Sequence, residues 1–163
     1  MRLLIDGDSS GHRDLLIKIA RDYDLELVWV CNHASRPPWP EEGLKLTVKH
    51  MDTTAQAADM EIMNLSGPGD VVVTGDLGLA SVCVVRGAAA LSPRGFWFKQ
   101  DELMQRLEFR ALAARMRRGG VNLEHKPPHK RLDDHRFDLE LRRAIESHLE
   151  PPPPHPAGED PAL

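Results

Sequence analysis

The sequence LLIDGDSSG, residues 3–11, opens with three apolar side chains that suit a short buried strand. The apolar run ends at two aspartates, Asp6 and Asp8, which stand one residue apart, and a helical pattern follows. A buried strand followed by a helix is typical of the first unit of a parallel α/β fold. The two acids raise a further question, since they either cap the helix or are held together to bind a positively charged ligand.

Strand-like and helix-like segments alternate along the chain after this first unit. The continuous β-branched run VVVT, residues 71–74, is typical of a central parallel strand. Because strands alternate with helices, the expected class is α/β, a three-layer sandwich with a central, mainly parallel sheet. The expected strands are 3–5, 25–31, 44–48, 71–74 and 88–91, and the expected helices are 11–22, 53–66, 77–85, 100–118 and 134–149.

Length and composition indicate one globular domain, since the 163 residues are 41% hydrophobic and 28% charged. We expect this domain over residues 1–149, with a basic helical segment at 109–149, followed by a disordered Pro-rich tail at 150–163. No apolar run approaches the roughly 20 residues that span a bilayer, so no membrane partner is expected. Cys31 and Cys83 lie in apolar runs and no export signal is evident, which predicts reduced core thiols in the cytoplasm.

Charge is unevenly distributed along the chain. The net charge of −4 argues against a general nucleic-acid coat. Residues 1–108 carry 11 Lys and Arg against 16 Asp and Glu, whereas residues 109–148 carry 10 against 6. This basic segment either guides a nucleic-acid backbone or is an ordinary solvated helical surface. The basic residues concerned are Arg115, Arg117, Arg118, Lys126, Lys130 and Arg131.

Two aspartates follow expected strands directly. Asp6 follows the first strand, and Asp76 follows the fourth in VVVTGDLGLA. Ligands of open parallel sheets bind beyond the carboxyl ends of the strands, where the strand order reverses. If the two strands are neighbours, the carboxylates meet at one edge, and a divalent cation would relieve their repulsion.

A third acid is placed by helical geometry. Counted at about 100° per residue, the apolar stripe of the helix at 53–66 consists of Ala55, Ala58, Ile62 and Leu65. Asp59 falls within the sector of this stripe that Ala55 and Ile62 share, whereas Glu61 falls off its flank. An unpaired carboxylate on an inward face costs several kcal/mol, so Asp59 needs a reason to be there. We take Asp59 as the more telling acid and Glu61 as a second candidate.

The acids taken together predict a metal site. For each acid taken alone, helix capping is the alternative. Asp8, Ser9 and Ser10 suit the cap of the first helix, and Asp76 suits the cap of the helix at 77–85. Carboxylate ligands favour Mg²⁺ or Mn²⁺ over Zn²⁺. Such an ion activates water and neutralises charge on a scissile phosphate, which suits hydrolysis of a phosphodiester.

The acidic motifs also resemble those of a known family. Four separate motifs occur in the order and spacing of the bacterial YaiI/YqxD family, whose domain is PIN-like, and the match runs from Met1 to about Leu149. Two departures stand out: Ser10 and Gly11 replace a Cys-Pro pair, and NLEHKPPHK replaces a glycine-rich turn. The matched positions are Asp6, Asp8, Asp59, Glu61, Thr74, Asp76, Pro93, Arg94, Gly95 and Arg110, with Ser92 in place of an Asn.

The resemblance implies a metal-dependent nuclease, because PIN-like domains generally cut nucleic acids, often RNA, with acids at the ends of the first and fourth strands. We expect Asp6, Asp59 and Asp76 to be catalytic, and Asp8 and Glu61 to join them as metal ligands. RNA is preferred over DNA as the substrate. The oligomeric state is left open.

Further side chains are candidates for substrate contacts. Arg94 follows the last strand and Arg110 stands in the helix at 100–118, so either suits a phosphate or an ordinary surface. Asn32 and Ser35 follow the second strand and suit ligand contacts or turn formation equally. Thr74 is a candidate because it matches the Thr of the family's T-x-D motif.

Two rival functions use the same residues differently. A haloacid dehalogenase-type phosphatase also opens with a strand and an Asp-x-Asp motif, but no later paired-acid motif with a preceding Lys is evident. A non-catalytic RNA- or protein-binding module on a PIN-like scaffold would gain nothing from clustered carboxylates. A zinc pair at His125 and His129 is disfavoured, since prolines separate them and no second ligand pair accompanies them.

Overall fold

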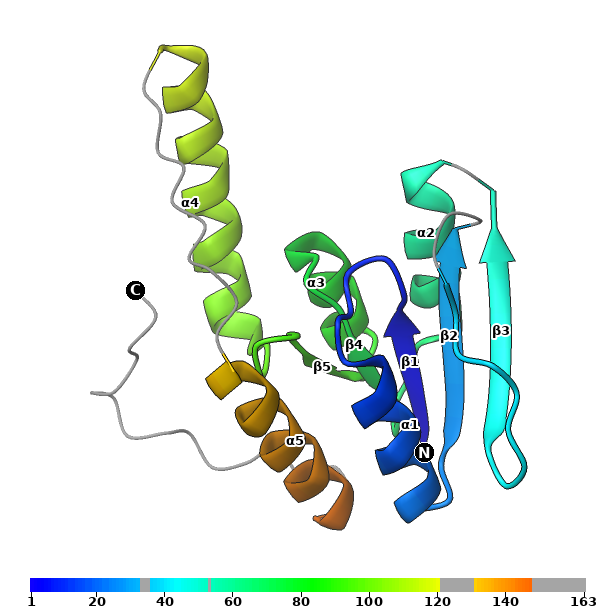
Figure 1. Ribbon diagram of the computed structural model, residues 1–163. Coiled ribbons are helices and arrows are strands. Elements are labelled where there is room, and N and C mark those ends of the chain that lie inside the picture. The colour runs from blue at the N-terminus through cyan, green and yellow to red at the C-terminus, as the bar shows by residue number, and fades with distance from the viewer. Residues whose placement is uncertain (33–35, 53, 121–130, 148–163) are drawn as a thin grey trace.

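The computed structural model describes residues 1–32, 36–52, 54–120 and 131–147 (Figure 1). Strands and helices alternate as expected, and most observed bounds lie within two residues of the expected ones. The strands are β1 (Arg2–Asp6), β2 (Glu26–Asn32), β3 (Lys45–Met51), β4 (Val71–Val73) and β5 (Ala89–Leu91). The helices are α1 (Arg13–Asp22), α2 (Ala55–Leu65), α3 (Leu77–Val85), α4 (Gln100–Arg118) and α5 (Arg131–Glu146).

The five strands form one sheet in the order β3-β2-β1-β4-β5, and every pair within it is parallel. The chain first winds outward from β1 to β3 and then returns to place β4 on the other side of β1. The order therefore reverses between β1 and β4, where Ile5 pairs with Val73. This confirms the α/β class and brings the carboxyl ends of those two strands together, as the aspartate argument requires.

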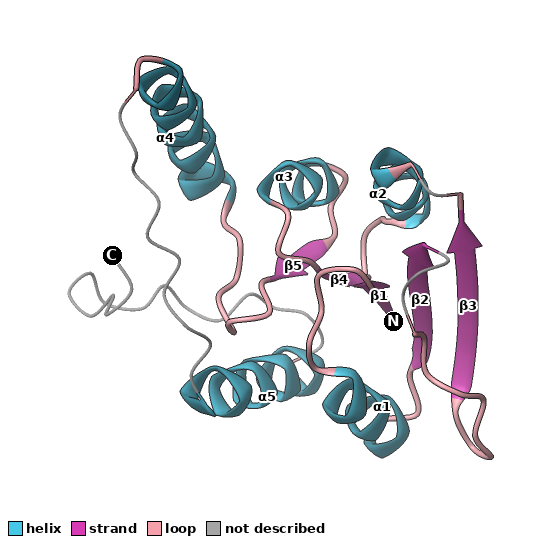
Figure 2. Ribbon diagram, turned by 45° about the horizontal axis from the view of Figure 1, so that its top comes forward, coloured by secondary structure: helices cyan, strands magenta, loops and turns pink. Residues whose placement is uncertain are grey.

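Helices α1 and α5 cover one face of the sheet and α2 and α3 the other (Figure 2), and an apolar core lies at each face. On one face, Leu16 and Ile19 of α1 and Phe137 of α5 pack against the sheet. On the other face, Ile62 of α2 and Leu79 of α3 pack against Leu4, Val28, Val30 and Val72. Alternate residues of β1 thus point into different cores, which is why that strand is apolar throughout.

The observed starts of two helices differ from the expected ones. The cap predicted at Asp8, Ser9 and Ser10 is wrong, because α1 begins at Arg13 with His12 as its N-cap residue. The helix expected at 134–149 begins earlier, at Arg131. Within the described residues no helix is both long and apolar enough to cross a membrane. The expected tail at 150–163 and the side chains of Ser35, His125, Lys126, His129, Lys130 and Arg131 lie outside what the structure describes.

Helix α4 differs from the other helices because most of it projects beyond the sandwich (Figures 1 and 2). Its first turns pack on α3 and β5 through Leu103, which is buried, and Leu107, which is half-buried. Beyond Leu107, its large side chains are exposed. The helix thus stands beside the carboxyl edge of the sheet.

Candidate functional site

Asp6 is the most deeply buried acid at the carboxyl edge, with 4% of its surface exposed. Its Oδ2 accepts hydrogen bonds from Ser9 Oγ at 2.9 Å and from Thr74 Oγ1 at 2.8 Å. Burial raises the pKa of Asp6 above its ordinary value, while the hydrogen bonds from Thr74 and Ser9 oppose that rise. The two hydroxyls therefore hold a carboxylate where desolvation disfavours its charge.

The same hydroxyls join the end of β1 to the loop after β4. Thr74 Oγ1 accepts a hydrogen bond from the backbone N–H of Asp76 at 3.0 Å, and Ser9 Oγ accepts one from the N–H of Gly75 at 3.0 Å. Each hydroxyl thus donates to Asp6 and accepts from the β4 loop. Asp6 and Asp76 are in this way fixed relative to each other by two short hydrogen-bonded bridges.

Asp76 caps α3, as the alternative for this residue predicted. Its Oδ1 accepts a hydrogen bond from the backbone N–H of Leu79 at 3.0 Å. The cap orients one oxygen of the carboxylate toward the helix. Since a carboxylate has several acceptor positions, capping and metal binding are compatible in Asp76.

Asp59 is half-buried on α2, and the negative charges of the other three aspartates act on it. Its pKa is raised to about 6, first by burial and then by the negative charges of Asp6, Asp76 and Asp8. The helical-face argument placed Asp59 inward, and its electrostatic coupling to both strand-end aspartates agrees with that placement. Four aspartates from three elements and their loops thus share one electrostatic environment.

Asp8 approaches the end of β2. Its Oδ2 accepts a hydrogen bond from Asn32 Nδ2 at 3.2 Å, so Asn32 supports an acid of the cluster. Between the two acids, a Cβ on Gly7 would lie 2.3 Å from Trp29 Nε1 and 2.9 Å from Cys31 Cβ. Glycine is therefore required at this position so that the chain can turn Asp6 inward and Asp8 toward β2.

Glu61 is oriented differently from Asp59. Its Oε1 lies 2.5 Å from Lys49 Nζ of β3, and the charges that raise the pKa of Asp59 do not include it. The structure therefore joins Glu61 to a lysine rather than to the aspartates. The sequence argument, which put Glu61 off the flank of the apolar stripe, anticipated this difference.

The two candidate arginines occupy different surroundings. Arg94 lies in the loop after β5, with its guanidinium carbon 5.9 Å from the centre of the Phe96 ring. Arg136 of α5 covers the same ring more closely, at 3.7 Å. Arg110 is exposed on the projecting part of α4.

Sequence reasoning missed two supporting side chains. Ser9 was taken as a helix cap, whereas it bridges Asp6 and Gly75. His12 lies 2.5 Å from the carbonyl oxygen of Pro93 through Nε2 and 3.1 Å from Asp134 Oδ1 through Nδ1, and it stacks on Phe137. No sequence motif predicts either contact, because each joins segments that are distant in the sequence.

The donor set fits a hard divalent cation held partly by water. Among the described residues, no three His, Cys, Asp or Glu side chains are close enough together to enclose an ion by themselves. Mg²⁺ is commonly bound by one or two carboxylates and keeps several waters, so a closed cage is not needed. Asp6 and Asp76, joined through the hydroxyls of Thr74 and Ser9, could hold such an ion together with water.

Comparison with known proteins agrees with the motif-level resemblance. Residues 4–147 match a family model described as "Uncharacterized BCR, YaiI/YqxD family". The chain is 34% identical over 149 residues to a UPF0178 protein of Alkaliphilus metalliredigens, covering 91% of this chain and 94% of that one. It is 31% identical over 153 residues to a UPF0178 protein of Burkholderia cenocepacia, covering 93% and 100%. No solved structure matches it. On this evidence the chain belongs to the YaiI/YqxD family.

Proposed function

We propose that this protein is a Mg²⁺- or Mn²⁺-dependent phosphodiesterase that hydrolyses nucleic acid, with RNA preferred over DNA. The observation that carries the proposal is the buried carboxylate of Asp6, held by Ser9 and Thr74 at the carboxyl edge where the strand order reverses. The charges of Asp6, Asp76 and Asp8 all act on Asp59, and together with burial they raise its pKa to about 6. A fold gains no stability from four acids that repel one another. Such an arrangement is typical of a site that binds a cation.

In this proposal Asp6 and Asp76 are the principal ligands. Asp59, with help from Asp8, balances the remaining charge and orients water. When bound, a divalent cation would lower the pKa of a water molecule and neutralise charge on the scissile phosphate. Ser9 and Thr74 keep Asp6 in position by donating to its Oδ2. Asn32 holds Asp8 in the same way.

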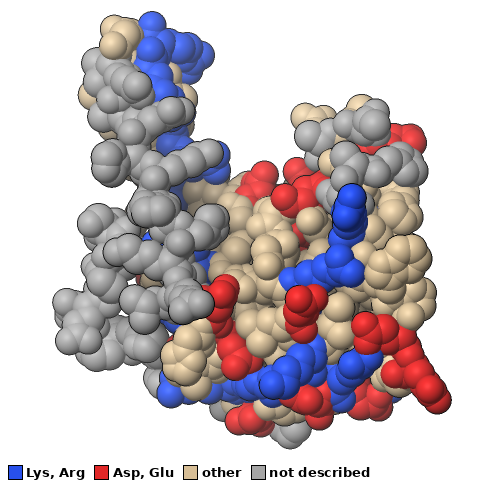
Figure 3. Space-filling model, viewed as in Figure 1, with Lys and Arg blue, Asp and Glu red and all other residues tan. Residues whose placement is uncertain are grey.

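A polyanionic substrate must approach this acidic edge past a basic surface. Arg106, Arg110 and Arg117 are exposed and spaced four and seven residues apart, which aligns them along one side of α4. Figure 3 shows basic side chains along α4 and acidic side chains at the neighbouring edge of the sandwich. We propose that these arginines, with Arg94, contact phosphates next to the cleaved one.

The family relationship is compatible with this function and does not assign it, since the relatives' names state no activity. The two free buried cysteines suit a reducing compartment, and we propose the cytoplasm as its location.

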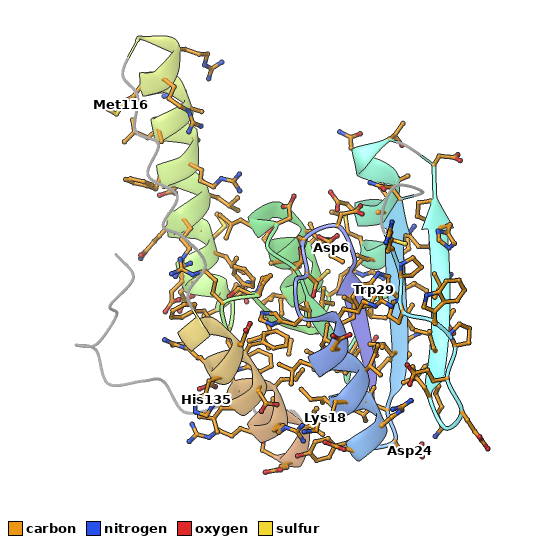
Figure 4. All side chains as sticks on the ribbon, viewed as in Figure 1. Asp6, Lys18, Asp24, Trp29, Met116 and His135 are labelled. Carbon is orange, nitrogen blue, oxygen red and sulfur yellow. The ribbon has the colours of Figure 1, made fainter. Side chains whose placement is uncertain are left out.

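The decisive test combines metal binding with cleavage. Melting of the wild-type protein would be followed during Mn²⁺ and Mg²⁺ titration, and a panel of single-stranded and structured RNA and DNA would be incubated with the metal-loaded protein. We expect Asp76→Asn to lose both the metal-induced rise in Tm and the cleavage. Asp24→Asn is the matched control, since Asp24 lies at the opposite end of the sheet from Asp6 (Figure 4).

The outcomes separate the rival functions. Cleavage of a small phosphomonoester but of no nucleic acid would favour the phosphatase. RNA binding that survives chelation and Asp76→Asn, without cleavage, would favour the binding module. Either result would overturn the proposed nuclease.

A further inference from the structure

The projecting part of α4 carries an apolar stripe that the described residues do not cover. Phe109 is 68% exposed, Leu112 53% and Met116 41%. Their spacing of three and four residues places them on one side of the helix. Figure 4 shows Met116 near the far end of α4, on the side turned away from the sheet.

This part of α4 needs a partner on physical grounds. Helices of fewer than about 12 residues are marginal in water, and most helical stability in proteins comes from packing of an apolar face. Between Leu107 and Arg118 the helix runs on for three turns with its large apolar residues exposed. An exposed apolar stripe on a projecting helix is typical of an interaction surface.

The spacing is that of a short coiled coil. Phe109 and Met116 are seven residues apart with Leu112 between them, which is the pattern of positions a and d. Position a of the preceding heptad is Glu102 and position d is Gln105, so the apolar contact is confined to the outer half of the helix. A partner is therefore expected to pack on that outer half.

The charges beside the stripe indicate which partner fits. Asp101, Glu108 and Arg115 follow one another at seven-residue spacing along one border of the stripe, position g of the heptads. In an antiparallel pair of helices, positions g of the two chains lie side by side. A second copy running antiparallel, with Phe109 of each chain packed on Leu112 of the other, would place its Arg115 beside Glu108 of the first, and the reverse, as twofold symmetry requires.

The shape of the molecule permits this arrangement. Because α4 projects beyond the sandwich, an antiparallel copy would place the second sandwich at the far end of the helix pair (Figure 1). We propose that the outer half of α4, with the stripe Phe109, Leu112 and Met116, is a homodimer interface formed with α4 of a second copy in antiparallel orientation. This interface is independent of the proposed nuclease activity, because it uses the side of α4 that bears the stripe rather than the arginines.

The test is the association state of the full chain, measured by sedimentation equilibrium from about 10 µM to about 500 µM protein. The wild type is expected to form a dimer in this range. Phe109→Glu/Leu112→Glu is expected to weaken association at least tenfold. Ala111→Glu adds a charge to the same helix away from the stripe and is expected to leave association unchanged.

Charge reversal tests the orientation even if the double variant loses helical structure. Arg115→Glu is expected to weaken the dimer, and Arg115→Glu combined with Glu108→Arg is expected to restore it. A wild type that stays monomeric throughout, or a dimer that survives Phe109→Glu/Leu112→Glu, would overturn the proposal. Protection of the stripe within a monomer would assign it instead to another segment of the same chain.

Discussion

The carboxyl edge of the sheet and the outer half of α4 are opposite cases of local stability. At the edge, Asp6 is buried, doubly hydrogen-bonded and joined to the β4 loop through Ser9 and Thr74, although the acids around it repel one another. On α4, apolar side chains are exposed and no opposing layer is described. The first region is rigid but electrostatically unfavourable, and the second is favourable for helix formation but unsupported.

We propose that each region is completed from outside the chain, the edge by a cation and the outer half of α4 by a second copy. Repulsion among fixed carboxylates is relieved by a cation, which binds best where the ligands cannot move apart. An apolar helical stripe is completed by a second apolar surface. The variants below test how far the edge of the sheet can adapt to a substitution and how little packing stabilises the outer half of α4.

The largest effect is expected from Gly7→Ala, because the new Cβ would lie 2.3 Å from Trp29 Nε1. Trp29 of β2 is 1% exposed and packed in the core on the α1 face of the sheet, so the chain has to shift. We expect a loss of about 2–4 kcal/mol in the free energy of unfolding, measured by urea titration.

Gly11→Ala is the matched control, since a Cβ at Gly11 meets no atom within 4 Å. It should change stability by less than about 0.5 kcal/mol. If the two variants were equally stable, the turn between Asp6 and Asp8 would be far more adaptable than the structure indicates.

The next effect contrasts two leucines of the same helix. Leu103 is 2% exposed where α4 meets α3, whereas Leu112 is 53% exposed on the projecting part. Leu103→Ala should cost about 2–3 kcal/mol, and Leu112→Ala less than about 0.5 kcal/mol in dilute protein, both by urea titration. A large cost at Leu112 in dilute monomer would mean that the stripe is covered within one chain.

Thr74→Val sharpens the description of the edge. It keeps the shape of a fully buried side chain but removes the donor to Asp6 and the acceptor for the Asp76 N–H. We expect a loss of about 1–3 kcal/mol and a further rise in the pKa of Asp6, followed by carboxyl NMR. Thr74→Ser keeps the hydroxyl and should recover most of the hydrogen-bond contribution, whereas a Thr74→Val variant as stable as the wild type would contradict the bridging role of this hydroxyl.

The sequence predicted the architecture well because its signals were local. Continuous apolar runs such as Val71–Val73 and punctuation such as the turn at residues 66–70 do not depend on distant contacts. The inward position of Asp59 followed from helical periodicity in the same way.

What escaped prediction depends on contacts between distant segments. Ser9 was interpreted as a helix cap. Its hydrogen bond from the N–H of Gly75 could not be predicted, because the two residues stand 66 positions apart in the sequence. The pairing of Glu61 with Lys49 required the packing of α2 on β3. The projection of α4 was also hidden, since its pattern predicts a helix but not what lies against it.

Asp59→Asn is expected to change stability less than Gly7→Ala, Leu103→Ala or Thr74→Val, and it is the sharpest test of the edge. In the unfolded chain the Asp59 carboxyl titrates near its ordinary pKa of 3.8, and in the folded protein near a pKa of about 6. Between these values the folded protein keeps a proton that the unfolded chain has lost. The free energy of unfolding therefore falls as pH rises through this window, and the loss is complete above about pH 6.

Asn removes this titration, so the variant should match the wild type below pH 3.8 and exceed it above about pH 6. The gain should be about 1 kcal/mol, once solvent screening at this half-buried carboxyl is allowed for. It would be measured as the difference between the two pH profiles of unfolding, which cancels the contributions of other acids. At pH 7.5 Mn²⁺ should stabilise the wild type more than the variant, because only the wild type has the Asp59 charge to be relieved. A variant that is less stable than the wild type at neutral pH would mean that Asp59 supports the fold, and the repulsion at the edge would then need no cation to explain it.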